Sequence, residues 1–229
     1  MRVAGIIGGI GPESTIEYYR LIIADWRQRR NDGSYPRLFV NSIDLKAMIA
    51  LVTGNRLEEL AAFLAAEIAA LARAGADFAA LAANTPHIVF PELRRRSPIP
   101  LVSIVEAACG AAKKKSYRRA ALFGTRFTMQ ASFYPEVFVP AGISIVLPAD
   151  EEQGAIHDIY MGELLNGSFR DESAARMRAI IRRLSAQEHI DCVVLAGTEL
   201  PLLLPEPRYE GVPMLDTTKA HVTRIVEQL

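Results

Sequence analysis

Four short polar segments each follow a short apolar run and carry residues suited to holding an anion. Two lie in the first half of the chain, Gly8-Gly9-Ile10-Gly11 and Asn84-Thr85, and two in the second, Gly124-Thr125 to Thr128 and Thr198-Glu199. Each places small residues, amides or hydroxyls at the predicted start of a helix, where backbone N–H groups and the helix dipole favour a carboxylate or phosphate. We therefore predict substrate-binding roles for Gly9, Ile10, Asn84, Thr85, Thr125, Thr128 and Thr198. The competing interpretation is that Ser14, Thr85, Thr128 and Thr198 only cap helices.

The elements that must position these segments alternate between strands and helices. Short apolar runs bounded by turn residues predict buried parallel strands at 3–8, 37–43, 77–83, 99–105, 119–124, 143–147, 191–196 and 212–215. Apolar residues at three- and four-residue steps predict a helix from Asn55 to Ala74, with Asn55 as its cap and Gly75 as its left-handed end. Further helices are expected near 152–166, 172–187 and 217–229. This alternation indicates an α/β fold with parallel sheets.

The chain repeats itself, which indicates two similar halves. The run Val3–Gly9 has a counterpart in Ala120–Thr125, and Asp77–Pro86 has one in Asp191–Leu200. The separations agree, because Gly8 and Ala83 are 75 positions apart and Gly124 and Gly197 are 73 positions apart. We predict two Rossmann-like halves related by a pseudo-twofold axis, with a ligand cleft between them. The predicted domains are 1–98 plus about 216–229, and 99–215.

Composition narrows the class of protein. Lys+Arg and Asp+Glu each number 26, so bulk electrostatic attraction to nucleic acid or membrane is not expected. The basic cluster Lys113–Lys115 lacks interleaved aromatic residues and is interpreted as a solvated linker or helix end. No apolar stretch has the length of a membrane span, and the N-terminus lacks the pattern of a signal peptide. We expect a cytoplasmic protein that binds neither nucleic acid nor membrane.

The glycine-rich loop only partly resembles a dinucleotide fingerprint. In Gly9-x-Gly11-x-x-Ser14 the third position is serine, and Pro12 alters the turn. The nearest acidic residue beyond the second strand, Asp44, lies farther along than the motif requires. A nicotinamide cofactor is therefore not expected.

Together these segments resemble the cofactor-independent aspartate/glutamate racemase family. The resemblance rests on Gly8–Thr15, on Ala83–His87, on Gly124–Met129, on Ile156–Gly167 and on Gly197–Pro201. It covers nearly the whole chain in order. It implies a small carboxylate or amino acid as ligand, no pyridoxal phosphate and no metal, and a homodimer, since relatives are commonly dimers.

The resemblance also implies a pair of cysteines, one on each face of the substrate α-carbon, acting as general acid and base. The matching positions here are Ala83 and Gly197, and neither side chain can transfer a proton. The two cysteines present, Cys109 and Cys192, fall elsewhere and are interpreted as small core residues.

Other groups could act in place of the thiols. Glu199 and His87 are the nearest titratable candidates, although Glu199 could instead cap a helix and His87 could orient a neighbour through a hydrogen bond. Glu13 and Asp44 are more distant options. Tyr160 is a possible phenolic donor, but an aromatic residue in an amphipathic helix usually belongs to the core.

Relatives carry an Arg or Gln after the second strand to hold a distal carboxylate. Here Met48–Thr53 is apolar, and the nearest cation is Lys46. This difference indicates a ligand without a distal carboxylate, or a gap in the correspondence at this point.

Three hypotheses follow. The chain is a diverged cofactor-independent isomerase, decarboxylase or lyase acting on a small carboxylate. Alternatively, it is a non-catalytic small-molecule binder or regulatory protein. The third hypothesis is an amino-acid racemase made inactive by replacement of its two cysteines.

Overall fold

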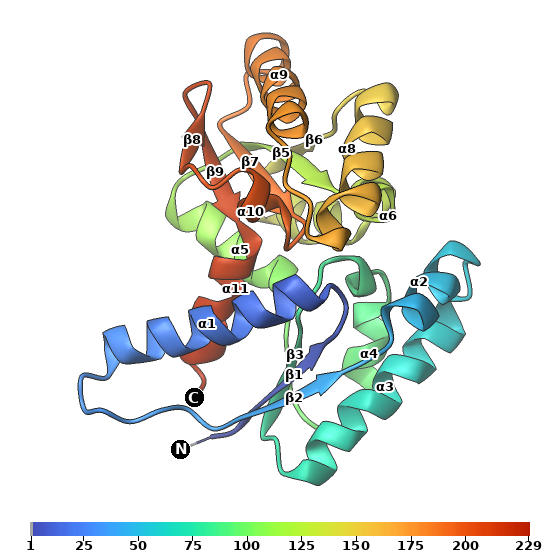
Figure 1. Ribbon diagram of the computed structural model, residues 1–229, viewed down its shortest axis with the longest axis vertical. Coiled ribbons are helices and arrows are strands. Elements are labelled where there is room, and N and C mark those ends of the chain that lie inside the picture. Colours follow the sequence, from blue (N-terminus) through green and yellow to red (C-terminus); the bar gives the residue numbers. More distant parts are fainter. Residues whose placement is uncertain (1) are drawn as a thin grey trace. The chain divides into compact units, whose positions relative to one another are not determined.

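A computed structural model describes residues 2–229 as two compact units, and each is considered by itself (Figure 1). Unit 1 comprises the residues up to Ile104 together with Thr218–Leu229, and unit 2 comprises Val105–Thr217. The predicted boundary after residue 98 therefore moves to Ile104, because the strand that precedes it pairs within the sheet of unit 1.

Unit 1 is built on a sheet of four parallel strands in the order β2-β1-β3-β4. Its elements along the chain are β1 (Ala4–Gly8), α1 (Pro12–Arg29), β2 (Leu38–Ser42), α2 (Leu45–Thr53), α3 (Leu57–Ala74), β3 (Phe78–Leu81), the 3₁₀ helix η1 (Thr85–Val89), α4 (Phe90–Arg96) and β4 (Leu101–Val102). Helix α11 (Thr217–Val226), at the end of the chain, completes the unit.

Helices cover both faces of this sheet. On one face, Tyr18, Ile22 and Trp26 of α1 pack with Val222, Ile225 and Val226 of α11 over alternate strand residues, including Ala4 and Ile6. Figure 1 shows α11 lying close to α1. On the other face, α3 approaches so closely that a Cβ on Gly5 would stand 3.0 Å from Leu71 Cδ1. Successive side chains along a strand point to opposite faces of the sheet. Because helices cover both faces, the central strands β1 and β3 are apolar along their whole length.

Helix α3 tests two predicted boundaries. Gly75 adopts the left-handed conformation at the helix end, with φ of 100°, as expected. The predicted cap at Asn55 is wrong, because the helix begins at Leu57 after Arg56, and no side chain caps it. Asn55 instead has a φ of 51° in the turn that follows α2.

Unit 2 has a sheet in the order β6-β5-β7-β9-β8, parallel except for β8. Its elements are α5 (Ile104–Lys114), β5 (Arg119–Gly124), α6 (Arg126–Gln130), α7 (Phe133–Phe138), η2 (Val139–Ala141), β6 (Ser144–Val146), α8 (Asp150–Gly162), η3 (Leu164–Asn166), α9 (Asp171–Glu188), β7 (Cys192–Ala196), α10 (Leu200–Leu203), β8 (Arg208–Tyr209) and β9 (Val212–Asp216). The eight predicted strands are all present, and β8 was not predicted. When the strands are numbered along the chain within each unit, β2-β1-β3-β4 and β6-β5-β7-β9 both have the sheet order second, first, third, fourth. The sequence repeat is therefore also a repeat of topology.

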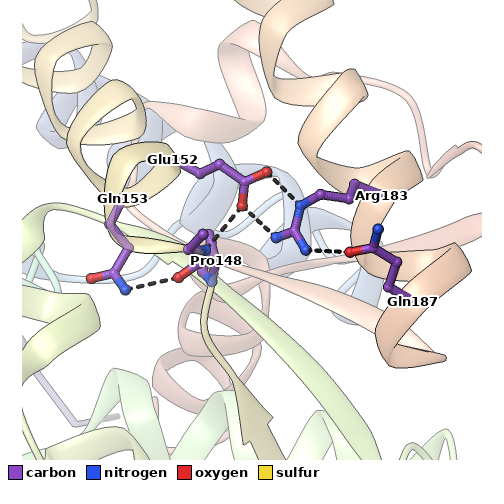
Figure 2. A network of polar contacts seen from close by, with 6 residues as sticks. Pro148, Glu152, Gln153, Arg183 and Gln187 are labelled. Atoms are coloured by element: carbon purple, nitrogen blue, oxygen red, sulfur yellow. Dashed lines mark hydrogen bonds and ion pairs between the residues drawn. The ribbon is translucent and has the colours of Figure 1, made fainter.

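Helices α8 and α9 cover one face of the unit 2 sheet. Ile156 and Ile159 of α8 pack with Met177 and Ile181 of α9 against strand residues such as Phe123. The first turn of α8 is fixed by a polar network (Figure 2).

In that network the guanidinium of Arg183 donates two hydrogen bonds to the carboxylate of Glu152, one from Nε at 2.6 Å. Glu152 also accepts the backbone N–H of Ala149, and Gln153 Nε2 donates to the carbonyl of Pro148 at 2.8 Å. These contacts hold the helix that carries Tyr160.

Among the helices of residues 2–229, none combines the length and apolar character needed to cross a bilayer.

Candidate functional site

The loop between β1 and α1 is shaped by two glycines. Gly9 and Gly11 have φ values of 76° and 99°, which residues with a side chain rarely adopt. A Cβ on Gly9 would also stand 2.3 Å from the carbonyl oxygen of Ile43. The loop therefore brings its backbone against the chain that follows β2, and α1 begins at Pro12 without a side-chain cap.

The hydroxyls of this loop serve its own structure. Thr15 Oγ1 accepts the N–H of Gly9 at 2.9 Å and lies against Gly8, where a Cβ would stand 2.5 Å from Thr15 Cγ2. Ser14 Oγ contacts the carbonyls of Gly11 and Ala82, and so ties α1 to the end of β3. The alternative interpretation that Ser14 caps the helix is wrong, since Ser14 lies inside α1.

The end of β3 lies directly beside this loop. Strands β1 and β3 pair in parallel up to Ile7 and Leu81, so the residues that follow each strand come together. Ala83, Asn84 and Thr85 are all buried there, at 7%, 3% and 8% exposure. Unit 1 thus brings together the predicted Gly9, Ile10, Asn84 and Thr85 at one edge of its sheet.

His87 belongs to the packing beneath this edge. Its Nε2 accepts the backbone N–H of Ile104 at 3.3 Å, and its ring stacks on Phe90 with centroids 4.6 Å apart. Burial, reinforced by the nearby His221, lowers the pKa of His87 to about 3. A neutral imidazole whose Nε2 lone pair is already engaged is suited to orienting its neighbours rather than to accepting a proton.

In unit 2, the equivalent edge lies at the ends of β5 and β7, which pair up to Gly124 and Ala196. The side chain of Thr125 caps α6 by accepting the N–H of Thr128, and the two hydroxyls lie 3.2 Å apart. The helix cap is therefore Thr125 and not Thr128, which lies inside α6. Both residues lie beside the strand end that leads to Gly197.

The space expected for a side chain at position 197 is occupied. An ideal Cβ built on Gly197 would stand 2.4 Å from Cε2 and 3.1 Å from Cζ of Tyr160, and 3.2 Å from Leu200 Cδ1. Real Cβ contacts below 3.0 Å essentially do not occur, so the ring and a side chain at 197 exclude one another. The aromatic ring of α8 thus fills the position that the family resemblance assigns to the second cysteine.

Tyr160 is part of a buried polar group with Thr198 and Glu199. Its hydroxyl donates a hydrogen bond to Glu199 Oε2, which also accepts from the hydroxyl of Thr198 at 2.9 Å. All three residues are buried, and Glu199 is 1% exposed. Glu199 precedes α10 but its side chain makes no cap, so the predicted capping alternative is wrong.

Burial, together with the charge of Glu199 and the hydrogen bond to it, raises the pKa of Tyr160 well above its usual value. The phenol therefore keeps its proton across the neutral range. A carboxylate held by two hydroxyl donors can take up or release a proton through either of them.

Further candidates are the two buried cysteines and Asp44, which caps a helix. Cys192 begins β7 at the end opposite Gly197, and burial raises the pKa of its thiol. Cys109 lies in α5 and is buried as well. Asp44 caps α2 through the N–H of Lys46 at 2.8 Å, and Met48 of the apolar segment is buried. Over residues 2–229, no group of three His, Cys, Asp or Glu side chains is placed to hold a metal ion.

The contact between Tyr160 and Gly197 is the feature that sequence reasoning missed. The sequence pattern predicts only that Tyr160 is a possible phenolic donor or a core residue of an amphipathic helix. The one available signal was a glycine at a position where the family carries a functional side chain, because such a glycine often marks a close approach by another group.

Comparison with known proteins agrees with this architecture. Residues 7–225 match the family model described as Asp/Glu/Hydantoin racemase. The broad specificity amino-acid racemase RacX of Bacillus subtilis is 24% identical over 218 residues, covering 93% of this chain and 92% of RacX.

Two solved structures superpose over all of this chain and 99% of theirs. PH1733, an aspartate racemase homologue from Pyrococcus horikoshii, is 34% identical with a TM-score of 0.83. A Yersinia pestis protein provisionally assigned as an Asp/Glu racemase is 28% identical with a TM-score of 0.89. The chain therefore belongs to the Asp/Glu/hydantoin racemase family.

Proposed function

We propose that this protein binds a small carboxylate or amino acid and acts on it as a cofactor-independent isomerase, decarboxylase or lyase. Family membership supports the class of ligand. The two sheet edges support it further, because each gathers small and hydroxyl residues at the ends of parallel strands, where ligands of such folds bind.

The observation that carries the proposal is the contact of Tyr160 with Gly197. Two-thiol racemisation needs a thiol at both family positions, and here the second is filled by an aromatic ring. A racemase that had merely lost its thiol would leave an open space at this point. The filled space favours a site with different chemistry over a racemase made inactive by simple replacement of its cysteines.

A second candidate function is a non-catalytic binder or regulatory protein. It is favoured by Ala83, because the first of the two family acid/base positions carries no titratable group here. Under this hypothesis the residues at the strand ends would hold a ligand without changing it.

The test is a panel of small amino acids, hydroxy acids and dicarboxylic acids, incubated with the protein in D₂O and followed by ¹H NMR. We expect at least one acid to raise the melting temperature and to show α-proton exchange, loss of CO₂ or formation of a double bond. Binding without any chemical change would establish the second candidate. An unchanged melting temperature and unchanged spectra for every acid would contradict both.

A further inference from the structure

We propose that Tyr160 and Glu199 form a proton relay that replaces the missing thiol of unit 2, with the phenol contacting the substrate and Glu199 as the terminal base. This inference rests on the proposed function. It assigns the residues that move a proton on one face of the substrate α-carbon.

Position is the first support. A thiol sulfur at residue 197 would lie one bond beyond the Cβ, and that Cβ would stand 3.1 Å from Tyr160 Cζ. The phenolic oxygen lies one bond beyond the same Cζ. The ring that carries this hydroxyl therefore occupies the space in which the family's acid/base side chain would begin.

Connection is the second support. The same hydroxyl donates to Oε2 of Glu199, and the hydroxyl of Thr198 also donates to this oxygen at 2.9 Å. The carboxylate is 1% exposed, so bulk water does not compete strongly for its protons. A buried carboxylate bonded to a hydroxyl is the arrangement in which a proton can pass along the hydrogen bond.

The step balances without any other reactant. The substrate α-C–H bond breaks and its proton forms an O–H bond on the phenol of Tyr160. At the same time the original phenolic O–H breaks, and that proton forms an O–H bond on Glu199 Oε2. The phenol stays neutral throughout, and the negative charge moves from Glu199 to the α-carbon and the substrate carboxyl group. The reverse step returns a proton to the same face.

The stereochemical consequence separates this relay from a two-thiol racemase. The family resemblance assigns the other acid/base thiol to position 83, where alanine cannot deliver a proton, so the proton returns to the face from which it left. The relay therefore predicts α-proton exchange with retention of configuration.

The experiment uses the full chain in D₂O with the L and D forms of aspartate, glutamate and alanine as separate probes. Exchange is measured by ¹H NMR and configuration by chiral chromatography. We expect one enantiomer of at least one probe to incorporate deuterium without inversion. Tyr160→Phe keeps the ring and is expected to slow exchange about 100-fold or more, as is Glu199→Gln.

Tyr134→Phe is the matched control, because Tyr134 is another fully buried tyrosine of unit 2 outside this group. It is expected to exchange within about twofold of the unmodified protein, a margin small beside the roughly hundredfold effect of acid/base groups. The pH profile adds a readout that a purely structural role would not move. Exchange should rise with ionisation of one carboxyl group, and any residual exchange by Glu199→Gln should lack that rise.

Each other result overturns the inference in a recognisable way. Exchange by Tyr160→Phe at the unmodified rate would remove the relay and leave the proposed function standing. Exchange accompanied by inversion would show a second acid/base group and contradict a one-sided relay. Absence of exchange and of any new product in the unmodified protein would overturn the relay and the enzymatic function together.

Discussion

The Cε2 atom of Tyr160 lies 2.4 Å from the point at which a Cβ on Gly197 would stand. Because the ring is buried and its hydroxyl is bonded to Glu199, it has little freedom to move aside. The two residues therefore depend on one another, and this dependence can be measured.

Gly197→Ala is expected to lower the free energy of unfolding by about 1–3 kcal/mol, the usual cost of overpacking a core. Urea denaturation provides the measurement. Gly110→Ala is the matched control, since a Cβ on this exposed residue of α5 meets nothing within 4 Å. It should raise the free energy of unfolding by about 0.5–1 kcal/mol, because alanine favours a helix over glycine.

In a Tyr160→Leu background, the cost of Gly197→Ala should largely disappear, because leucine lacks the ring atoms that collide with the new Cβ. Equal costs in both backgrounds would show that the ring does not limit position 197.

Restoring the two family cysteines should give racemase activity only when the ring of Tyr160 is removed from the space beside position 197. Ala83→Cys combined with Gly197→Cys is expected to remain without racemase activity, since the second thiol collides with Tyr160. Adding Tyr160→Leu should allow exchange with inversion, detected with aspartate and glutamate in D₂O. Equal activity of the double and triple variants would contradict the steric account.

Acid should destabilise the protein through two buried histidines. The pKa of His87 is lowered to about 3 and that of His221 to about 4, in both cases chiefly by burial. An unfolded histidine titrates near its ordinary value of about 6.5. As the pH falls from about 6.5, the unfolded chain therefore binds protons that the folded chain does not. The free energy of unfolding then decreases by up to about 1.4 kcal/mol per pH unit for each histidine.

His87→Gln keeps an acceptor for the N–H of Ile104 and removes one of these titrations. Its stability should consequently fall less steeply between pH 6.5 and 4 in urea denaturation. His189→Asn, at an exposed residue in the left-handed conformation that asparagine tolerates, leaves both buried histidines in place and is the matched control. Identical slopes for His87→Gln and the unmodified protein would refute the assignment.

The network at the start of α8 should contribute measurably to stability. Arg183→Met removes two hydrogen bonds to Glu152 in a partly buried setting, and is expected to cost about 1 kcal/mol. Arg182→Met, one residue earlier on α9, breaks the more exposed pair with Glu210 and should destabilise the protein less than Arg183→Met does. A smaller effect for Arg183 than for Arg182 in thermal denaturation would contradict this assignment.

The sequence alone was sufficient to predict the architecture, because buried strands and helix ends marked by glycine have recognisable local sequence patterns. Short apolar runs located β1 and β5, and the left-handed end of α3 followed from Gly75. The helix start was misplaced at Asn55, since several residues around a turn can serve as caps and tertiary packing selects among them. The short antiparallel strand β8 has no comparable apolar pattern.

The site was predictable only in part. Strand pairing brings Gly124 beside Ala196, and that register follows from parallel topology. The contact of Tyr160 with Gly197 depends on how α8 packs on the sheet, which no local pattern specifies. Likewise, the hydroxyl of Thr198 could have capped a helix, and only the fold shows that it donates to Glu199.

Unit 1 is assembled from two stretches of chain separated by all of unit 2, and this order has a consequence during synthesis on the ribosome. Val222, Ile225 and Val226 of α11 cover the apolar face that includes Tyr18, Ile22 and Trp26. A nascent chain must expose that face until α11 has been synthesised, while unit 2 is continuous and can fold first. We expect most of unit 1 to be synthesised before unit 2 but to complete its folding afterwards. Its uncovered apolar face would be available to chaperones until then.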